Sequence, residues 1–67
     1  MQLTPREFEA VAWAAHGLCV SEIAQEMSCS YSTAKSFLAT ARRRYEALNT
    51  ANLVYLVYKE LRDEAME

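Results

Sequence analysis

The sequence holds little glycine, proline, cysteine or histidine, and each scarcity excludes a class of protein. With one glycine and one proline in 67 residues, it has no glycine-rich phosphate loop and no low-complexity tract. Two cysteines, Cys19 and Cys29, are too few for a disulfide-stapled secreted domain, and we expect both to be reduced. His16, the single histidine, forms no metal-ligand spacing with them. We therefore expect no metal and no catalytic site, with His16 at the surface or at a helix end.

Long apolar runs are also missing. No segment approaches the roughly 18 apolar residues that a membrane-spanning helix needs, and residues 1–6 lack the basic and apolar regions of a secretion signal. We expect a cytoplasmic protein that binds no membrane, no cofactor and no small-molecule ligand. A chain of 67 residues forms one domain, which leaves no room for most enzyme architectures.

What the sequence does contain is helical periodicity. Apolar residues at helical spacing predict an all-α fold of four helices, over about residues 5–16, 20–27, 31–45 and 50–64. The first helix begins with a capping box, in which Thr4 is the N-cap, Pro5 the first helical residue and Glu7 the third. Gly17 is a natural left-handed stop for it. Ser30 and Asn49 are the predicted N-caps of the third and fourth helices.

Charge is distributed unevenly along the chain. The formal net charge is −2, yet residues 35–44 hold four cations and no acid, and both flanking segments are acidic. Such a distribution predicts a dipolar molecule with one face suited to phosphate. An ordinary solvated charge cluster would give the same pattern, so charge alone does not decide between them.

The second and third predicted helices are joined by a tight turn of about four residues, as in a helix-turn-helix motif. The inner face of the third helix consists of Ala34, Phe37, Leu38, Ala41 and Tyr45. Its outer face carries small residues, hydroxyls and cations: Ser32, Thr33, Lys35, Ser36, Ala39, Thr40, Arg42 and Arg43. Such a helix can enter a DNA major groove roughly 12 Å wide, with the run Arg42 to Arg44 at the groove rim. The alternative is a helix with an ordinary polar exterior.

The fourth predicted helix has more apolar surface than one core can cover. Leu53, Val57 and Leu61 align on one face, with Val54 beside them. The remaining apolar side chains, Tyr55, Leu56 and Tyr58, predict an interface with a second copy of the chain. The alternative is that the tyrosines lie flat on the surface of the domain.

A set of residues carries a family resemblance: Leu3-Thr4-Pro5-Arg6-Glu7, Gly17, Glu22-Ile23-Ala24, Ser30, Thr33 and Lys35. At these spacings they resemble the LuxR-type (GerE-like) helix-turn-helix domain of bacterial transcription regulators. The resemblance covers about residues 3–62 and implies that the third helix reads DNA while the fourth often dimerises. By position it implies a base or phosphate contact for Lys35, backbone contacts for Ser21, Thr33 and Arg43, and groove-facing positions for Ser36 and Ala39. Ser30, Ser32, Thr40 and Arg42 complete the DNA-binding residues that we predict.

Several residues depart from the family pattern. Cys19 stands where the family usually caps its second helix with Ser or Thr, and Tyr31 stands where the third helix often begins with Pro. Within the third helix, Ala34 replaces the usual Val and Phe37 replaces the usual His. Glu46 stands where a Gly commonly ends the third helix, and we expect its presence to lengthen that helix or distort its end. Ser21 replaces a common Lys, which together with the acidic total predicts weaker non-specific DNA binding.

We interpret the sequence as a stand-alone homodimeric transcriptional regulator that reads an inverted repeat in double-stranded DNA. One alternative is an interaction protein of the same fold that sequesters another regulator through its fourth helix. Another is a DNA-binding domain taken from a longer protein. The acidic surface favours sequestration, whereas Lys35 and the run Arg42 to Arg44 favour DNA.

Overall fold

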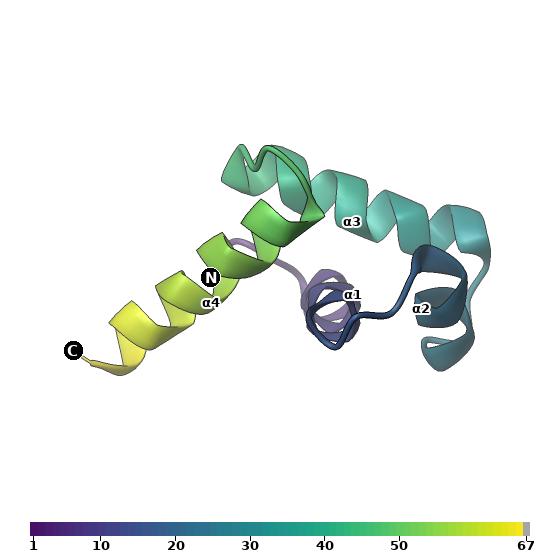
Figure 1. The fold of residues 1–67 in the computed structure, drawn as a ribbon, viewed down its shortest axis with the longest axis horizontal. Helices are drawn as coiled ribbons and strands as arrows, with labels where there is room; N and C mark the ends of the chain where they lie inside the picture. Colours follow the sequence, from purple (N-terminus) through teal and green to yellow (C-terminus); the bar gives the residue numbers. More distant parts are fainter. Residues whose placement is uncertain (67) are drawn as a thin grey trace.

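The computed structural model describes residues 1–66 and confirms the all-α fold. The four helices are α1 (Pro5–Ala15), α2 (Val20–Glu26), α3 (Tyr31–Tyr45) and α4 (Thr50–Ala65). Their bounds lie within one residue of the predicted ones. In Figure 1, α3 lies along one side of the molecule with α2 under its first turns, and α4 slants away from its other end. α1 contacts each of the other three helices.

The core lies where α1 and α3 approach each other, and alanines at this position let the two helices pack closely. Its buried residues come from all four helices and from the first residue after α2: Ala10, Val11, Ile23, Ala24, Met27, Ala34, Leu38, Ala41, Leu53 and Val57. The predicted inner faces of α3 and α4 are therefore confirmed. Leu61, Val54, Phe37 and Tyr45 are half-buried and pack against this core.

Three helices begin with the predicted caps. The hydroxyl of Thr4 accepts the N–H of Glu7 at 3.2 Å, and the Glu7 carboxylate accepts the N–H of Thr4 at 3.0 Å. The side-chain oxygens of Ser30 and Asn49 each accept the N–H three residues further on. These bonds satisfy backbone donors that have no partner within the helix, so they set where each helix starts.

Helices α1, α2 and α3 all end with one residue in the left-handed conformation. The φ angles are 89° for Gly17, 53° for Ser28 and 51° for Glu46. After each of them, the next N–H reaches back to the carbonyl five residues earlier: Leu18 to Trp13, Cys29 to Ala24 and Ala47 to Arg42. This is the Schellman arrangement, which satisfies carbonyls at the helix end.

The expectation that Glu46 would lengthen α3 or distort its end is wrong. The helix ends at Tyr45, and the N–H groups of Glu46 and Ala47 bond to the carbonyls of Arg43 and Arg42 at 3.2 and 2.9 Å. These two hydrogen bonds hold a non-glycine residue in a conformation that costs it about 1 kcal/mol. The turn from α3 into α4 therefore has the usual Schellman geometry, although Glu46 is a residue that disfavours the left-handed conformation.

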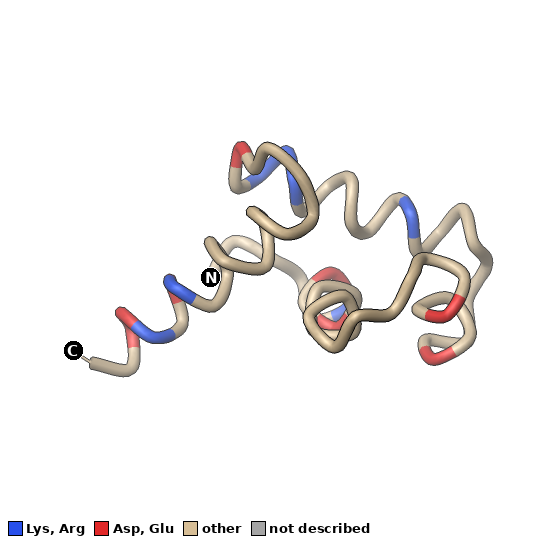
Figure 2. Tube along the Cα trace, viewed as in Figure 1, with Lys and Arg blue, Asp and Glu red and all other residues tan. Residues whose placement is uncertain are grey.

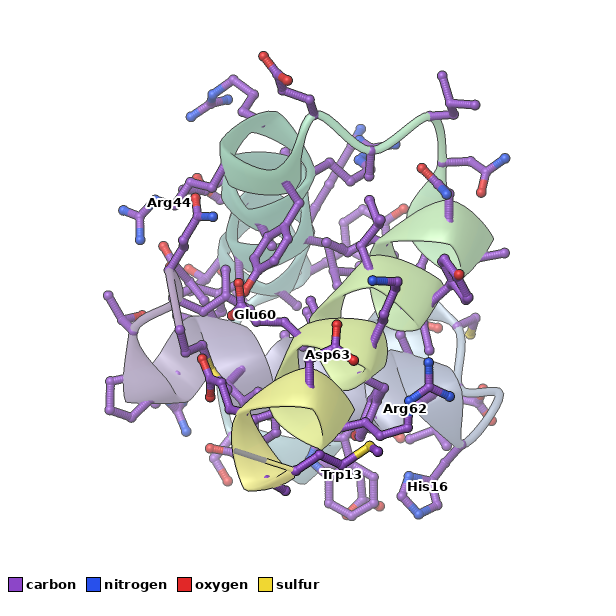
Figure 3. The ribbon with its side chains drawn as sticks, turned by 90° about the vertical axis from the view of Figure 1, so that its left-hand side faces the viewer. Trp13, His16, Arg44, Glu60, Arg62 and Asp63 are labelled. Atoms are coloured by element: carbon purple, nitrogen blue, oxygen red, sulfur yellow. The ribbon has the colours of Figure 1, made fainter. Side chains whose placement is uncertain are left out.

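Arg44 does not continue the basic surface of Arg42 and Arg43, contrary to its predicted place at the groove rim. Its guanidinium lies 2.8 Å from the Glu7 carboxylate and 2.9 Å from the carbonyl of Gln2. It therefore lies beside the N-terminal segment (Figure 3). The physical reason is burial: Glu7 is 7% exposed, and a buried carboxylate requires a cationic partner.

Tyr45, at the end of α3, links this helix to α4. Its hydroxyl donates to the Glu60 carboxylate at 2.7 Å and accepts the N–H of Gln2 at 3.4 Å. Burial, followed by the hydrogen bond to Glu60, raises the pKa of Tyr45 above its ordinary value. Together with the Arg44 contacts, these bonds fix the basic end of α3 against the rest of the molecule.

Candidate nucleic-acid interface

The turn between α2 and α3 is anchored to the core, and this anchoring sets the direction of α3. Four residues, 27–30, separate the two helices. Met27 is buried, and Cys29 is half-buried against the core. The guanidinium of Arg6 donates to the Met27 carbonyl at 2.8 Å and lies 5.9 Å from the centroid of the Phe37 ring. Arg6 therefore links α1 to both α2 and α3.

The first turn of α3 is suited to a phosphate. It contains no acidic residue, so the positive end of the helix dipole is not neutralised there. Ser30 and Thr33 are both exposed, and the Ser30 hydroxyl donates to the Thr33 hydroxyl at 2.9 Å. This bond orients two hydroxyls side by side at the helix start, where each retains further hydrogen-bonding capacity.

The outer face of α3 is open along its length. Ser32, Ser36, Ala39 and Arg43 follow one another in a single row, because their spacing of three or four residues matches the helical repeat. Most of the predicted DNA-facing side chains are exposed, namely Ser32, Thr33, Lys35, Ser36, Arg42 and Arg43, whereas Ala39 and Thr40 are half-buried. Ser32, Ser36 and Ala39 are small, so DNA can approach this part of the helix closely.

Three of the four cations on α3 lack an acidic partner, unlike most other cations in the molecule. Arg6, Arg44 and Lys59 form ion pairs with Glu9, Glu7 and Asp63. Within residues 1–66, Lys35, Arg42 and Arg43 form none. We call these three residues the basic face of α3, and Figure 2 shows the blue positions on this helix. Their charges are available to an external anion, even though the chain as a whole is acidic.

A shallow groove lies at the C-terminal end of the basic face. It has a volume of about 460 Å³ and is lined by Ala39, Arg42, Arg43, Glu46 and Ala47. The Arg43 guanidinium also lies 3.4 Å from the Thr40 hydroxyl. Sequence reasoning considered Glu46 only as a backbone position and missed its carboxylate as part of this surface. The available signal was an acid that follows directly after three arginines and a tyrosine.

Ser21 lies on α2, apart from the other predicted DNA-binding residues. It is exposed, and its hydroxyl is 3.2 Å from the Cys19 thiol. Its exposed neighbours include Glu22 and Glu26, so α2 presents acids rather than cations. The Glu22 carboxylate accepts the N–H of Cys19 at 2.9 Å, and this hydrogen bond lowers the pKa of Glu22.

The predicted dimer residues on α4 do not share one face. Tyr55 and Tyr58 line a groove of about 290 Å³ together with Val54, Lys59 and Arg62, which we call the tyrosine groove. Leu56 lines a different groove, beside Tyr45 and Glu60. On a helix, residues 56 and 58 point about 160° apart at roughly 100° per residue, so one flat interface cannot be centred on both.

The two tyrosines also differ from each other in their surroundings. Tyr58 is 39% exposed, and its ring centroid lies 6.3 Å from that of Phe8 on α1. Tyr55 is 57% exposed. Tyr58 therefore belongs partly to the domain, as the alternative of surface-lying tyrosines held, whereas more of the Tyr55 side chain is free to contact another molecule.

His16 lies at the end of α1, in agreement with its interpretation as a surface or capping residue. Its Nδ1 is 2.8 Å from the carbonyl of Ala12, and its ring packs beside Trp13 (Figure 3). No cluster of three or more His, Cys, Asp or Glu side chains suited to a metal ion occurs in residues 1–66. Within the same residues, no helix has the length and apolar character needed to cross a membrane.

Comparison with known proteins agrees with this geometry. Residues 1–58 match the model of the family described as bacterial regulatory proteins, luxR family. The chain is also similar to the transcriptional activator protein BjaR1 of Bradyrhizobium diazoefficiens, with 38% identity over 58 residues, which cover 87% of this chain and 24% of BjaR1. No solved structure shows significant similarity.

The matched region includes the whole helix-turn-helix motif and most of α4, which ends at Ala65. This family consists of DNA-binding regulators rather than enzymes, in agreement with the exposed basic face of α3. A family model that covers residues 1–58 of 67 accounts for the fold and for the motif together. The chain therefore belongs to the LuxR family of bacterial regulatory proteins.

Proposed function

We propose that this chain is a sequence-specific regulator that binds an inverted repeat in double-stranded DNA as a homodimer, with α3 in the major groove. The observation that carries the proposal is the basic face of α3: three cations without ion pairs on the exposed side of a helix that follows an anchored turn. A helix presented in this way can place its side chains against base edges. The BjaR1 relative is a transcriptional activator, which supports a role in regulation.

In this proposal the residues of α3 have two kinds of role. Lys35, in the second turn of α3, reaches a base edge, while Ser32, Ser36 and Ala39 allow the helix to approach the groove floor. Phosphates are contacted by residues at the helix start and at its basic end. These are Ser30, Thr33, Thr40, Arg42 and Arg43, with Ser21 of α2 contributing one further contact. Phosphate contacts position the helix, and base contacts supply the sequence information.

The homodimer follows from the amount of DNA that one helix can read. A single recognition helix contacts only a few base pairs, too few to select a site in a genome. We infer that two copies meet through the tyrosine groove, with Tyr55 at the centre, Tyr58 beside it and Leu56 outside the contact. In such a dimer the two α3 helices lie about 34 Å apart, one turn of DNA.

Selection from random DNA with the purified chain tests this proposal. We expect enrichment of an inverted repeat whose half-site centres lie about 10 base pairs apart, bound with two chains per duplex. Enrichment of single half-sites bound by one chain would contradict the homodimer but leave sequence-specific DNA binding in place. Failure to enrich any sequence would contradict DNA binding and favour the alternative, a protein that sequesters another regulator through α4.

A further inference from the structure

Glu46 places an unneutralised negative charge at the end of the basic face of α3. Its side chain is exposed and lines the same groove as Arg42 and Arg43. Among residues 1–66, it forms no hydrogen bond and no ion pair through its carboxylate. The charge is therefore neither used to cap a helix nor cancelled by a neighbour.

The backbone fixes this carboxylate close to the arginines. Glu46 has φ 51° and ψ 40°, and its N–H bonds to the carbonyls of Arg42 and Arg43. The following N–H, from Ala47, holds the same end of α3 with a bond of 2.9 Å. Because the main chain is held on both sides, the position of the Glu46 backbone relative to Arg42 and Arg43 is fixed.

We propose that Glu46 sets the affinity of the chain for the DNA backbone by weakening the phosphate contacts of Arg42 and Arg43. The inference rests on the proposed function and goes beyond it, since it assigns a negative role to an acid within the DNA-facing surface. A phosphate that enters the groove meets two guanidinium groups and one carboxylate. The Debye length at 0.1 M salt is about 10 Å, so a carboxylate that lines the same groove as the phosphate is only partly screened from it. Weak affinity for the DNA backbone shortens the time that the protein spends on non-specific DNA.

Glu46→Gln tests the charge without changing the size of the side chain or its backbone conformation. We expect this variant to bind a 20-base-pair random duplex and the selected site about threefold more tightly, by the same factor on both, at about 0.1 M salt. Fluorescence anisotropy with labelled duplexes measures both affinities. Glu64→Gln, in the last turns of α4, is the matched control because it changes the net charge equally. We expect no more than a marginal gain from it.

Two further variants separate charge from backbone strain. Glu46→Gly removes both the charge and the strained conformation, whereas Ser28→Gly relieves the same conformation at the end of α2 without a change of charge. If charge is the cause, Glu46→Gly matches Glu46→Gln in DNA affinity, and Ser28→Gly matches the unmodified chain. Circular dichroism checks that each variant keeps its helices.

The outcomes distinguish this inference from the function on which it rests. If Arg43→Ala weakens DNA binding while Glu46→Gln leaves it unchanged, the inference is overturned and the DNA-binding function stands. Equal gains from Glu46→Gln and Glu64→Gln also overturn it, because net charge then explains the effect. If the unmodified chain and Glu46→Gln bind neither duplex, both the function and the inference fail.

Discussion

Arginines 42, 43 and 44 are consecutive in the sequence, yet their surroundings assign them to different tasks. Arg42 and Arg43 are exposed and have no ion pair within residues 1–66. Arg44 is bonded to the buried Glu7 and to the carbonyl of Gln2. One basic tripeptide therefore supplies both exposed, unpaired charge and an internal clamp, because each residue along a helix points about 100° from the last.

Lys35→Ala and Arg43→Ala are expected to affect DNA binding in different ways. If Lys35 contacts a base edge, its loss costs about 1–3 kcal/mol on the selected site and relaxes one base position. Loss of Arg43 weakens binding to all sequences alike, because phosphates carry no sequence information. Competition assays with single-base variants of the site measure the difference. Equal losses on every sequence would assign Lys35 to a phosphate instead.

Glu7→Gln is expected to lower the free energy of unfolding by about 1–2 kcal/mol. The amide can still accept the N–H of Thr4, but the charge-assisted bond with Arg44 is lost from a site where Glu7 is 7% exposed. Urea unfolding followed by circular dichroism measures the change. Glu9→Gln is the control, because the Arg6–Glu9 pair is exposed and its loss should cost less than about 0.5 kcal/mol. Equal losses in the two variants would show that the Arg44 clamp adds nothing.

Three helices of this chain end with a residue in the left-handed conformation, and only one of these residues is glycine. Gly17 occupies the first, while Ser28 and Glu46 occupy the others at the cost of strain. In each case two backbone hydrogen bonds keep the Schellman geometry, so tertiary packing and these bonds outweigh the local preference of the side chain. Stability can therefore be gained at the two non-glycine positions.

Ser28→Gly is expected to stabilise the protein by about 0.5–1 kcal/mol, because glycine adopts a positive φ without steric cost. Thermal unfolding of the variant and of the unmodified chain measures the difference. Ser36→Gly is the control: Ser36 lies inside α3, where glycine costs about 0.5 kcal/mol relative to serine. A destabilised Ser28→Gly variant would mean that the serine side chain contributes more than its conformation costs.

Tyr55→Glu is expected to give a folded monomer. Tyr55 is 57% exposed and lines the tyrosine groove, so a charge there disrupts the proposed interface while leaving Leu53 and Val57 in the core. Adding Tyr58→Glu strengthens the effect but also removes the packing on Phe8. Sedimentation velocity at tens of micromolar measures the oligomeric state, and gel shifts on the inverted repeat measure the loss of affinity.

Leu56→Glu shows which face of α4 is used. Because Leu56 lies in the groove with Tyr45 and Glu60, we expect this variant to remain dimeric. A monomeric Leu56→Glu with a dimeric Tyr55→Glu would move the interface to the other flank of α4. An unmodified chain that is already monomeric under these conditions would refute the homodimer.

On the scale of the whole molecule, an acidic protein presents one basic side. Most cations outside α3 are paired, and the acids of α1, α2 and α4 lie away from the basic face of α3 (Figure 2). Such a molecule orients its basic side toward DNA, while its other sides repel it. This charge distribution limits binding to one orientation.

Affinity for the selected site is expected to fall as salt rises. Each neutralised phosphate contributes a slope of about 0.9 in a plot of log affinity against log salt concentration. Arg43→Ala should lower the magnitude of the slope by about one per bound chain, whereas Tyr55→Glu should leave the slope per bound chain unchanged. Anisotropy titrations between about 50 and 200 mM salt measure it. A slope near zero would show that the basic face of α3 makes no phosphate contact.

Features that depend on neighbours a few residues apart could be predicted from the amino-acid sequence. The capping box of α1, the N-caps of α3 and α4, the helix bounds, the stop at Gly17 and the inner faces of α3 and α4 all follow from interactions within about four residues, and their residue types identify them. The outward direction of Lys35, Arg42 and Arg43 follows from the same periodicity. The helix-turn-helix was therefore predictable before any helix had been placed in space.

The pairing of helix faces, by contrast, depends on how the helices pack in three dimensions. Arg44 pairs with Glu7, 37 positions away, because packing brings the end of α3 to the start of α1. Packing also separates Leu56 from Tyr58 and places Glu46 in a groove with Arg42 and Arg43. Local sequence patterns do not predict such contacts. A helical repeat defines which residues share a face, but it determines neither the angle at which two helices cross nor the neighbour that covers that face.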